Sequence, residues 1–356
     1  MKPLLSYIAP AAPATRRPGT GEEPFIRPEI GFVPAWFRER VGCSFGQDWH
    51  TRPEARLRDM ERIRDCLDTL FPAAKIGRLG EAEEPDILTG TFGACTVAGL
   101  FGMELVYGER DWPDTVGGGL TDRDVARLEP PDLDKNAFFQ GLMEQVDWIA
   151  DHVGPVRGFI NWQGVLNTAF RLRGLRVFTD MVEEPQRAEH LFSCIHATME
   201  EGARRLYRRQ RETGFGVDFF TVSNCVVNMI SPEHYEEFLL PWDRKLAEKF
   251  GRIGVHNCAW NANPYLDAYS SLPNVAYIDM GMESDLQRAQ ALFPETRRAL
   301  MIPPSFAAEQ PEARLLSHVE TWANRYGPCD LVFADLDASV QDDRVRFLLQ
   351  LSACAL

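Results

Sequence analysis

The sequence predicts an α/β protein, a single-domain (β/α)8 TIM barrel preceded by an N-terminal arm. Two observations lead to this fold class. Apolar runs of strand length alternate with amphipathic helical segments six times or more, which is typical of parallel strands joined by crossover helices. No G-x-G-x-x-G motif follows any of these runs and no Walker loop occurs, so an open nucleotide-binding sheet has less support. At 356 residues the chain is long enough for one such barrel.

Residues 1–28 are rich in Pro, Ala and Arg and carry little hydrophobic periodicity. We expect them to form a disordered or extended arm, and residues 29–356 to form the barrel. Helix ends are marked by residue type: Pro53 suits a first helical turn, and Ser231 followed by Pro232 suits an N-cap. The expected helices cover 52–70, 135–152, 184–213, 231–250, 263–271, 284–293, 309–326 and 341–352. The expected strands cover 156–162, 217–222, 252–258, 275–280, 298–302 and 330–335.

Composition excludes some classes of partner. The formal net charge of −14 argues against nucleic acid and against an anionic membrane surface, since both bind basic patches. No signal peptide and no apolar stretch of transmembrane length is evident. The eight cysteines are scattered singly, without CxxC pairs. We therefore expect a cytoplasmic protein acting on a small molecule, with most thiols reduced and buried.

The tripeptide His256-Asn257-Cys258 ends the apolar run of the strand expected at 252–258. Side chains two residues apart on a strand point to the same face, so the imidazole and the thiol should converge. In a barrel, functional groups lie at the carboxyl ends of the strands, which is where this pair falls. An imidazole nitrogen and a thiolate sulfur are half of a zinc site, and a catalytic zinc site requires a third protein ligand.

Several segments together resemble a known family. Residues 231–238 read S-P-E-H-Y-E-E-F, followed by L-P-W, and residues 255–258 read V-H-N-C. Residues 173–185 carry R-G, D-M and E-P in that order, and residues 285–289 read D-L-Q-R-A. These motifs are similar to those of the uroporphyrinogen decarboxylase superfamily, closest to its zinc-dependent methyltransferase-like and uncharacterised branches. The resemblance covers residues 31–352 and implies a barrel that carries a zinc-activated thiol chemistry.

The chain also departs from the family pattern. The arginine-bearing R-Q-A-G-R motif of the decarboxylase is absent, so a porphyrinogen substrate is not expected. In the methyltransferase branch a third ligand, usually Cys, lies after the final strand, where this chain has Leu336. We expect Asp335 or Asp337 to supply an oxygen ligand there, in preference to Cys329, which begins the strand and should lie at the opposite end. The alternative is that His256 and Cys258 only pack in a barrel without metal.

Polar residues at the other strand ends are the remaining site candidates. We expect the catalytic residues to be those that can orient a polar substrate or act as a general base. We expect their neighbours, and the loop beside Trp49, to contact the substrate. The catalytic candidates are Asn161, Asn224 and Asp279, and the substrate-binding candidates are Trp162, Gln163, Cys225 and His50.

Three functions follow from these residues. The first is a zinc-dependent methyl- or alkyl-transferase that activates a thiol, with a corrinoid protein as a candidate methyl carrier and a homodimer as a candidate assembly. The second is a metal-free decarboxylase or related lyase that uses a carboxylate among Asp279, Asp335 and Asp337. The third is a non-catalytic ligand-binding barrel.

Overall fold

The computed structural model describes residues 17–21, 23–72, 86–116 and 119–351. Its centre is a six-stranded sheet with the strand order β1-β8-β7-β6-β5-β4, in which every neighbouring pair is parallel. The strands are β1 (Ile26–Phe32), β4 (Phe220–Ser223), β5 (Ile253–His256), β6 (Val275–Gly281), β7 (Arg297–Met301) and β8 (Cys329–Leu336). A separate antiparallel pair consists of β2 (Glu104–Val106) and β3 (Asp114–Val116). The structure is thus an α/β protein built on a parallel sheet.

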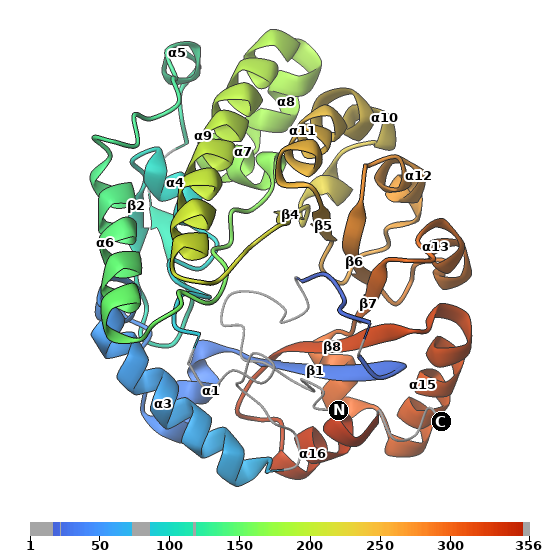
Figure 1. Cartoon of the computed structure of the whole chain (residues 1–356). Helices are drawn as coiled ribbons and strands as arrows, with labels where there is room; N and C mark the ends of the chain where they lie inside the picture. Colours follow the sequence, from blue (N-terminus) through green and yellow to red (C-terminus); the bar gives the residue numbers. More distant parts are fainter. Residues whose placement is uncertain (1–16, 22, 73–85, 117–118, 352–356) are drawn as a thin grey trace.

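Helices surround the strands on the outside (Figure 1). The helices expected over 52–70, 135–152 and 184–213 are confirmed as α3 (Pro53–Leu70), α6 (Ala137–His152) and α9 (Pro185–Glu212). The N-terminal region adds α1 (Pro34–Val41), α2 (Gln47–Thr51), α4 (Thr96–Leu100) and α5 (Asp122–Ala126), and α7 (Val165–Arg173) and α8 (Arg176–Glu183) precede α9. The C-terminal half carries α10 (Pro232–His234), α11 (Leu240–Phe250), α12 (Leu266–Ser270), α13 (Leu286–Leu292), α14 (Pro304–Glu309), α15 (Glu312–Tyr326) and α16 (Asp342–Gln350).

The expected helix over 231–250 is interrupted by a wider turn. Ser231 caps its start by accepting a hydrogen bond from the His234 N–H at 3.2 Å, as its sequence predicts. Residues Tyr235–Leu239 then form a π-helical turn before α11 begins. Pro241 explains the interruption, because its ring lacks an N–H and clashes with the preceding turn of a regular helix.

The strand expected at 156–162 is not a strand: the segment is irregular and pairs with no sheet neighbour. Side chains from other parts of the chain form hydrogen bonds with its backbone groups instead. Gln210 donates from Nε2 to the carbonyls of Val156 and Gly158, at 3.0 and 2.9 Å, and the Phe159 N–H donates to Thr89 Oγ1 at 2.9 Å. The segment satisfies its hydrogen bonds without a ladder. Among the described residues, therefore, no hydrogen-bonded strand joins β4 to β1 and closes the sheet into the expected barrel.

The N-terminal part contributes a strand that the sequence does not reveal. β1 begins at Ile26 and pairs with β8, so residues 26–28 belong to the sheet and not to an arm. The rest of the arm, residues 1–16, lies outside the described residues. Charged residues at alternate positions of I-R-P-E-I-G-F hide the strand pattern, because Arg27 and Glu29 are buried, 8 and 1 % exposed.

The two charges of β1 belong to a buried ionic cluster at the amino-terminal end of the sheet. Arg27 holds Asp330 with two hydrogen bonds, Nε to Oδ1 at 2.9 Å and Nη2 to Oδ2 at 2.8 Å. Arg27 Nη2 also lies 2.8 Å from Glu29 Oε1, and Arg297 binds Asp330 from β7. Burial acts to raise the pKa of Asp330, but Arg27 and Arg297 outweigh it and hold that pKa below its usual value. The cluster fixes β1 against β7 and β8.

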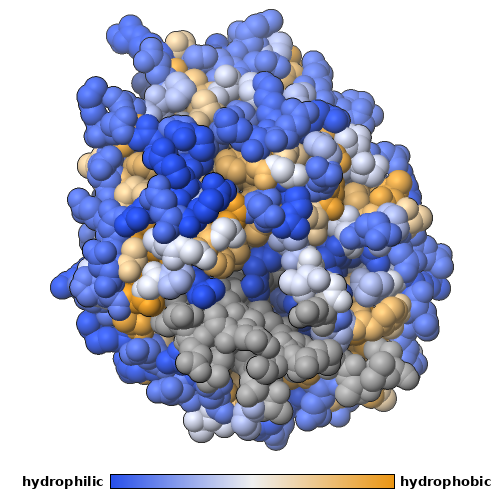
Figure 2. Space-filling model, in the orientation of Figure 1, coloured by the Kyte–Doolittle hydropathy of each residue, from blue (hydrophilic) through white to orange (hydrophobic). Residues whose placement is uncertain are grey.

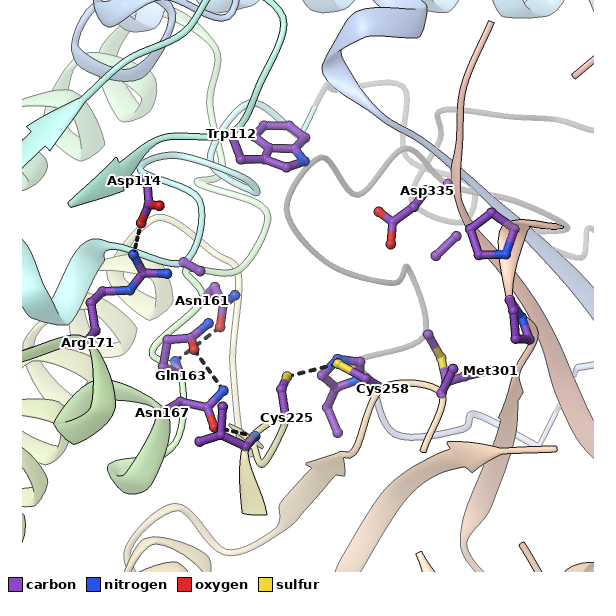
Figure 3. Close-up of a pocket in the computed structure, with 18 of the residues that line it drawn as sticks. Trp112, Asp114, Asn161, Gln163, Asn167, Arg171, Cys225, Cys258, Met301 and Asp335 are labelled. Carbon is purple, nitrogen blue, oxygen red and sulfur yellow. Dashed lines mark hydrogen bonds and ion pairs between the residues drawn. The ribbon is translucent and has the colours of Figure 1, made fainter. Parts of the chain in front are cut away.

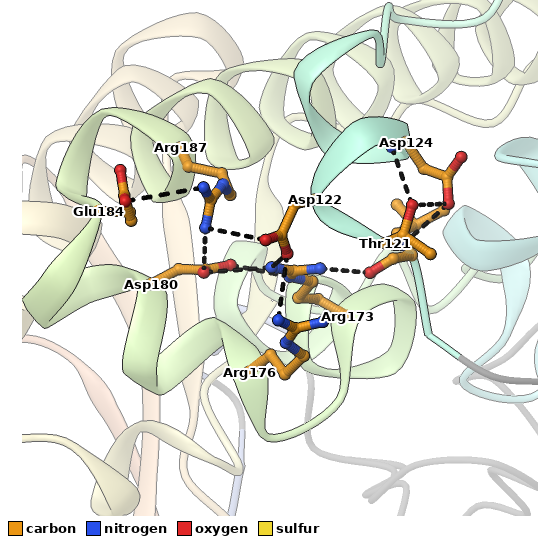
Figure 4. A network of polar contacts seen from close by, with 9 residues as sticks. Thr121, Asp122, Asp124, Arg173, Arg176, Asp180, Glu184 and Arg187 are labelled. Atoms are coloured by element: carbon orange, nitrogen blue, oxygen red, sulfur yellow. Dashed lines mark hydrogen bonds and ion pairs between the residues drawn. The ribbon is translucent and has the colours of Figure 1, made fainter.

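A second ionic network ties α7 to the helices around it (Figure 4). Arg173 at the end of α7 donates from Nε to Asp180 Oδ2 at 2.8 Å and from Nη2 to Asp122 of α5. Arg187 of α9 donates to Asp180 Oδ1 at 3.0 Å. The R-G and D-M motifs of this region therefore hold α7 in place, and α7 carries residues of the candidate site described below. No helix among the described residues is long and apolar enough to span a membrane.

Candidate metal centre and its cavity

Three ligand atoms converge at the carboxyl ends of β4 and β5. The Cys258 Sγ lies 3.2 Å from His256 Nε2 and 2.9 Å from Cys225 Sγ. The ligand atoms of Cys225, His256 and Cys258 all lie within 4.8 Å of one another. Two sulfurs and one imidazole nitrogen are a donor set that zinc accepts, and three protein ligands leave a fourth tetrahedral position for a substrate atom. The convergence of His256 and Cys258 is as expected, and Cys225 joins them.

Strand alternation is not what brings His256 and Cys258 together. β5 ends at His256, and Cys258 follows with a φ of 54°. This left-handed turn directs Cys258 back toward His256. Room for the turn comes from Gly281 of β6, where a Cβ would lie 2.1 Å from the Ala259 carbonyl oxygen. On the other side, the Asn224 N–H donates to the His256 carbonyl at 2.7 Å and so fixes Cys225 beside β5.

A carboxylate behind the cluster orients the imidazole. His256 Nδ1 lies 2.5 Å from Asp279 Oδ2, and the Asn257 N–H donates to Asp279 Oδ1 at 2.7 Å. Tyr269 in turn donates to Asn257 Oδ1 at 2.8 Å. A carboxylate that accepts from Nδ1–H leaves the lone pair on Nε2, which is the nitrogen that faces the two sulfurs. Asp279 therefore lies behind the imidazole and is not among the residues that line the cavity, where we expected a general base.

We predict that Asp279→Asn weakens zinc binding by about 10- to 100-fold. The amide Nδ2 of Asn would donate to His256 Nδ1, which moves the imidazole proton to Nε2 and blocks the metal-binding lone pair. A competition titration with a chromogenic chelator measures the affinity. Glu29→Gln is the control, because Glu29 is also buried but contacts Arg27 on β1, away from the cluster. Equal zinc affinity in the two variants would refute the orienting role of Asp279.

The cluster faces a cavity of about 750 Å³ (Figure 3). Seen from the side of Figure 1, the described surface of the molecule is mostly hydrophilic, with apolar patches between the polar residues (Figure 2). The cavity is bounded by the cluster, by a polar side beside α7, and by a third side that includes Met301 and Asp335. Its lining includes Phe32, Trp112, Asp114, Asn161, Gln163, Asn167, Arg171, Cys225, His256, Cys258, Met301 and Asp335.

Some of the expected site residues line this cavity. Asn161 and Gln163 form part of its polar side, and Cys225 joins the metal cluster, where we expected only a substrate contact. Asp335 also lines the cavity but does not belong to the cluster. Burial raises the pKa of the Asp335 carboxyl, and His256 opposes that rise only in part.

Other expected site residues lie elsewhere. Asn224 donates to Asp243 at 3.2 Å behind β4, and Trp162 is buried against Gly202 of α9. His50 is fully buried among aromatic rings and accepts from the Phe92 N–H at 3.0 Å, and burial, assisted by Arg56, lowers its pKa to about 3. None of these three lines the cavity.

The other two residues considered as metal ligands, Asp337 and Cys329, lie away from the cluster. Asp337 accepts hydrogen bonds from Ser339 within its own exposed turn, so the structure does not bring it to the cluster. Cys329 is buried at the start of β8, at the end of the sheet away from the cavity, as expected.

Several cavity residues were missed by sequence reasoning, namely Trp112, Asp114, Asn167 and Arg171. One signal was available for two of them. Asn167 and Arg171 follow Gln163 at intervals of four residues, which places them on one face of α7. Trp112 and Asp114 come from the β2–β3 region, which carries no strand pattern long enough to be predicted.

Backbone strain is concentrated in the cavity. Five non-glycine residues among those described have a positive φ, and three of them, Gln163, Cys258 and Asp335, line the cavity. Such conformations are costly for residues other than glycine and cluster at functional sites. The strain supports the assignment of this cavity as the functional site.

The parallel sheet and the Cys-His-Cys cluster at its carboxyl edge define the class of this protein, an α/β protein with a candidate metal centre. The uroporphyrinogen decarboxylase (URO-D) family model matches residues 76–301, and the chain belongs to this family. Its structure is similar to that of a methyltransferase from Methanosarcina mazei, with a TM-score of 0.63 at 14 % identity over 89 % of each chain. A vitamin-B12-independent methionine synthase-like protein from Listeria monocytogenes is more distant, with a TM-score of 0.38 at 12 % identity over 68 % of this chain and 72 % of that one. No curated protein matches the sequence.

Proposed function

We propose that this protein is a zinc-dependent methyl- or alkyl-transferase that activates a thiol substrate in the cavity, within a (β/α)8 barrel of the family type. The observation that carries the proposal is the convergence of Cys225, His256 and Cys258 on one point of the cavity wall. The similarity in fold to a methyltransferase agrees with it, although at 14 % identity that similarity concerns the fold alone.

The donor set fits zinc better than a hard cation. Thiolates and imidazole are the ligands of zinc, whereas magnesium and calcium prefer carboxylate and carbonyl oxygens. The oriented His256 and the two sulfurs would hold the metal, and when bound it would act as a Lewis acid that lowers the pKa of a substrate thiol.

The residues of the chain have separate tasks in this proposal. Asp279 keeps the Nε2 lone pair of His256 directed at the cluster, and the left-handed turn at Cys258 holds its sulfur beside that nitrogen. The polar side at Asn161 and Gln163 positions the substrate, and the apolar residues Phe32 and Met301 limit water around it. The substrate sulfur attacks the methyl or alkyl carbon of a donor, and the donor's leaving group departs with the bonding electron pair. A corrinoid protein is the proposed methyl donor.

The test is methyl transfer from methylcobalamin to 3-mercaptopropionate under anaerobic conditions. The proposal predicts the methyl thioether and cob(I)alamin in equal amounts, a rate that is lost when a chelator removes zinc, and recovery when zinc is returned. The product is measured by mass spectrometry and the corrinoid by its absorption spectrum. Turnover that persists unchanged in the chelated protein would contradict the zinc-dependent mechanism.

A metal-free lyase is the second candidate, and the carboxyl of Asp335 favours it. Burial raises the pKa of this group within the same cavity, which is the condition for a carboxylic acid to serve as a proton donor. Carbon dioxide release that survives chelation and is lost in Asp335→Asn would support the lyase. The loss of all turnover on chelation would exclude it in favour of the transferase.

A further inference from the structure

The polar side of the cavity offers hydrogen-bond donors and few acceptors. We call Asn161, Gln163, Asn167 and Arg171 the donor wall, since all four line the cavity on the side of α7 (Figure 3). Its oxygens are used within the protein. Asn161 Oδ1 accepts from the Gln163 N–H at 3.1 Å, and Gln163 Oε1 accepts from Asn167 Nδ2 at 3.1 Å. Asn167 Oδ1 accepts from the Val226 N–H at 3.1 Å.

Because these amide oxygens already accept hydrogen bonds within the protein, the amide nitrogens are the atoms that remain for a ligand. An amide has one acceptor oxygen and a nitrogen with two donor hydrogens. With the oxygens of Asn161 and Gln163 occupied, their Nδ2 and Nε2 groups are left, and among the described residues neither has a protein acceptor within hydrogen-bond distance. Both residues are more than nine-tenths buried, at 9 and 8 % exposure, and what remains exposed includes the surface that they present to the cavity.

Arg171 adds a positive charge at the far end of the wall. Its Nη1 binds Asp114, whose side chain is 77 % exposed, and lies 3.4 Å from Thr115 Oγ1. The Arg171 side chain itself is 24 % exposed, and the ion pair with Asp114 uses Nη1 of its guanidinium. Within the described chain, the Nη2 and Nε hydrogens of Arg171 have no acceptor, and they present the flat edge that suits a carboxylate.

The wall extends away from the metal cluster. Asn167 Oδ1 accepts a hydrogen bond from the N–H of Val226, and Val226 directly follows Cys225 of the cluster. The Asn167 end of the wall therefore lies beside the cluster. Arg171 lies four residues further along α7, about 6 Å along the helix axis. A ligand that contacts both the cluster and the Arg171 end of the wall therefore has its reacting atom at the cluster. Its hydrogen-bond acceptor group lies a few bonds away from that atom.

From this arrangement we infer that the donor wall binds a carboxylate on the substrate, so that the substrate class is a short thiol that carries a carboxylate at its other end. Asn161 and Gln163 donate to the carboxylate oxygens, and Arg171 supplies the opposite charge. The thiol part of the inference rests on the proposed function, whereas the carboxylate part rests on the wall alone.

Two probes of equal length separate these parts. In isothermal titration calorimetry of the zinc-loaded protein, 3-mercaptopropionate should bind at least about tenfold more tightly than 3-mercapto-1-propanol, because hydrogen bonds to a charged group are lost in the alcohol. Equal binding of the two thiols would overturn the inference and leave the proposed function standing. If neither thiol binds, the proposed function fails, and propionate then tests the carboxylate part of the inference alone. Binding of propionate to the protein would support that part, and no binding would overturn it.

Two substitutions show whether the wall is the cause. Gln163→Glu keeps an oxygen for Asn167 Nδ2 but replaces the donor amide by a negative oxygen, and Arg171→Gln removes the charge. Each should reduce the preference for the acid at least about tenfold, with little change for the alcohol. Arg252→Gln is the control, because Arg252 precedes β5 at the opposite end of the sheet. A preference that survives both substitutions, or that Arg252→Gln reduces equally, would refute the assignment.

Discussion

Cys225→Ser should lower the affinity for zinc by at least about a hundredfold. This effect is larger than the one expected for Asp279→Asn, which changes a residue behind the imidazole. Cys225 supplies one of the two sulfurs of the cluster, 2.9 Å from Cys258 Sγ, and a serine hydroxyl does not ionise to a comparable ligand at neutral pH. The affinity is measured by chelator competition at fixed pH, since zinc displaces protons from thiols and its binding depends on pH.

Two controls isolate the role of Cys225. Cys66→Ser removes a thiol on α3, remote from the cluster, and should leave zinc binding unchanged. Asp337→Ala tests the ligand that we expected from the sequence, and it should also bind one zinc with full affinity, because Asp337 is held by Ser339. If Asp337→Ala lost the metal and Cys225→Ser kept it, the ligand set of Cys225, His256 and Cys258 would be wrong.

The largest effect on stability is expected for Asp330→Asn. Asp330 is fully buried and is the shared partner of Arg27 and Arg297, so its neutralisation removes the counter-charge of Arg297 and one of the two carboxylates that contact Arg27. Removing one partner of a buried ion pair typically costs about 3–5 kcal/mol. We expect a decrease of this size in the free energy of unfolding, measured by urea denaturation of the metal-free protein.

Asp267→Asn provides the same chemical change on the surface. Asp267 pairs with Arg288, but its side chain is 71 % exposed, and exposed pairs contribute only about 0–1 kcal/mol. The prediction is that Asp330→Asn destabilises the protein by several times as much as Asp267→Asn. Similar losses in the two variants would mean that the buried cluster does not fix β1 to the sheet.

The helices were the most predictable part of the fold, because their caps and periodicity are local. Ser231 caps its helix and Pro53 begins α3 as the sequence indicates. The segment at 156–162 was mistaken for a strand, because its apolar pattern is strand-like while Gln210 and Thr89, far away in the sequence, supply its hydrogen bonds. β1 was missed for the opposite reason: its charges are buried by partners on β7 and β8 that no local pattern reveals.

The candidate site was only partly predictable. The convergence of His256 and Cys258 was foreseen from their spacing, although a left-handed turn achieves it rather than strand alternation. The sequence indicates that Cys225 lies at a strand end but not that it is a ligand, because the family resemblance implies a third ligand after the last strand. Asn161 and Gln163 line the cavity, whereas Asn224 bonds to Asp243 behind β4, an orientation that residue type alone does not determine.

X-ray absorption at the zinc edge tests the central claim most directly. Purified protein loaded with one zinc should show two sulfur scatterers at about 2.3 Å and at least one nitrogen at about 2.0 Å, with the sulfur contribution halved in Cys225→Ser. A first shell of only nitrogen and oxygen, or a sulfur contribution that Cys225→Ser does not change, would contradict the assignment of Cys225, His256 and Cys258 as the metal centre.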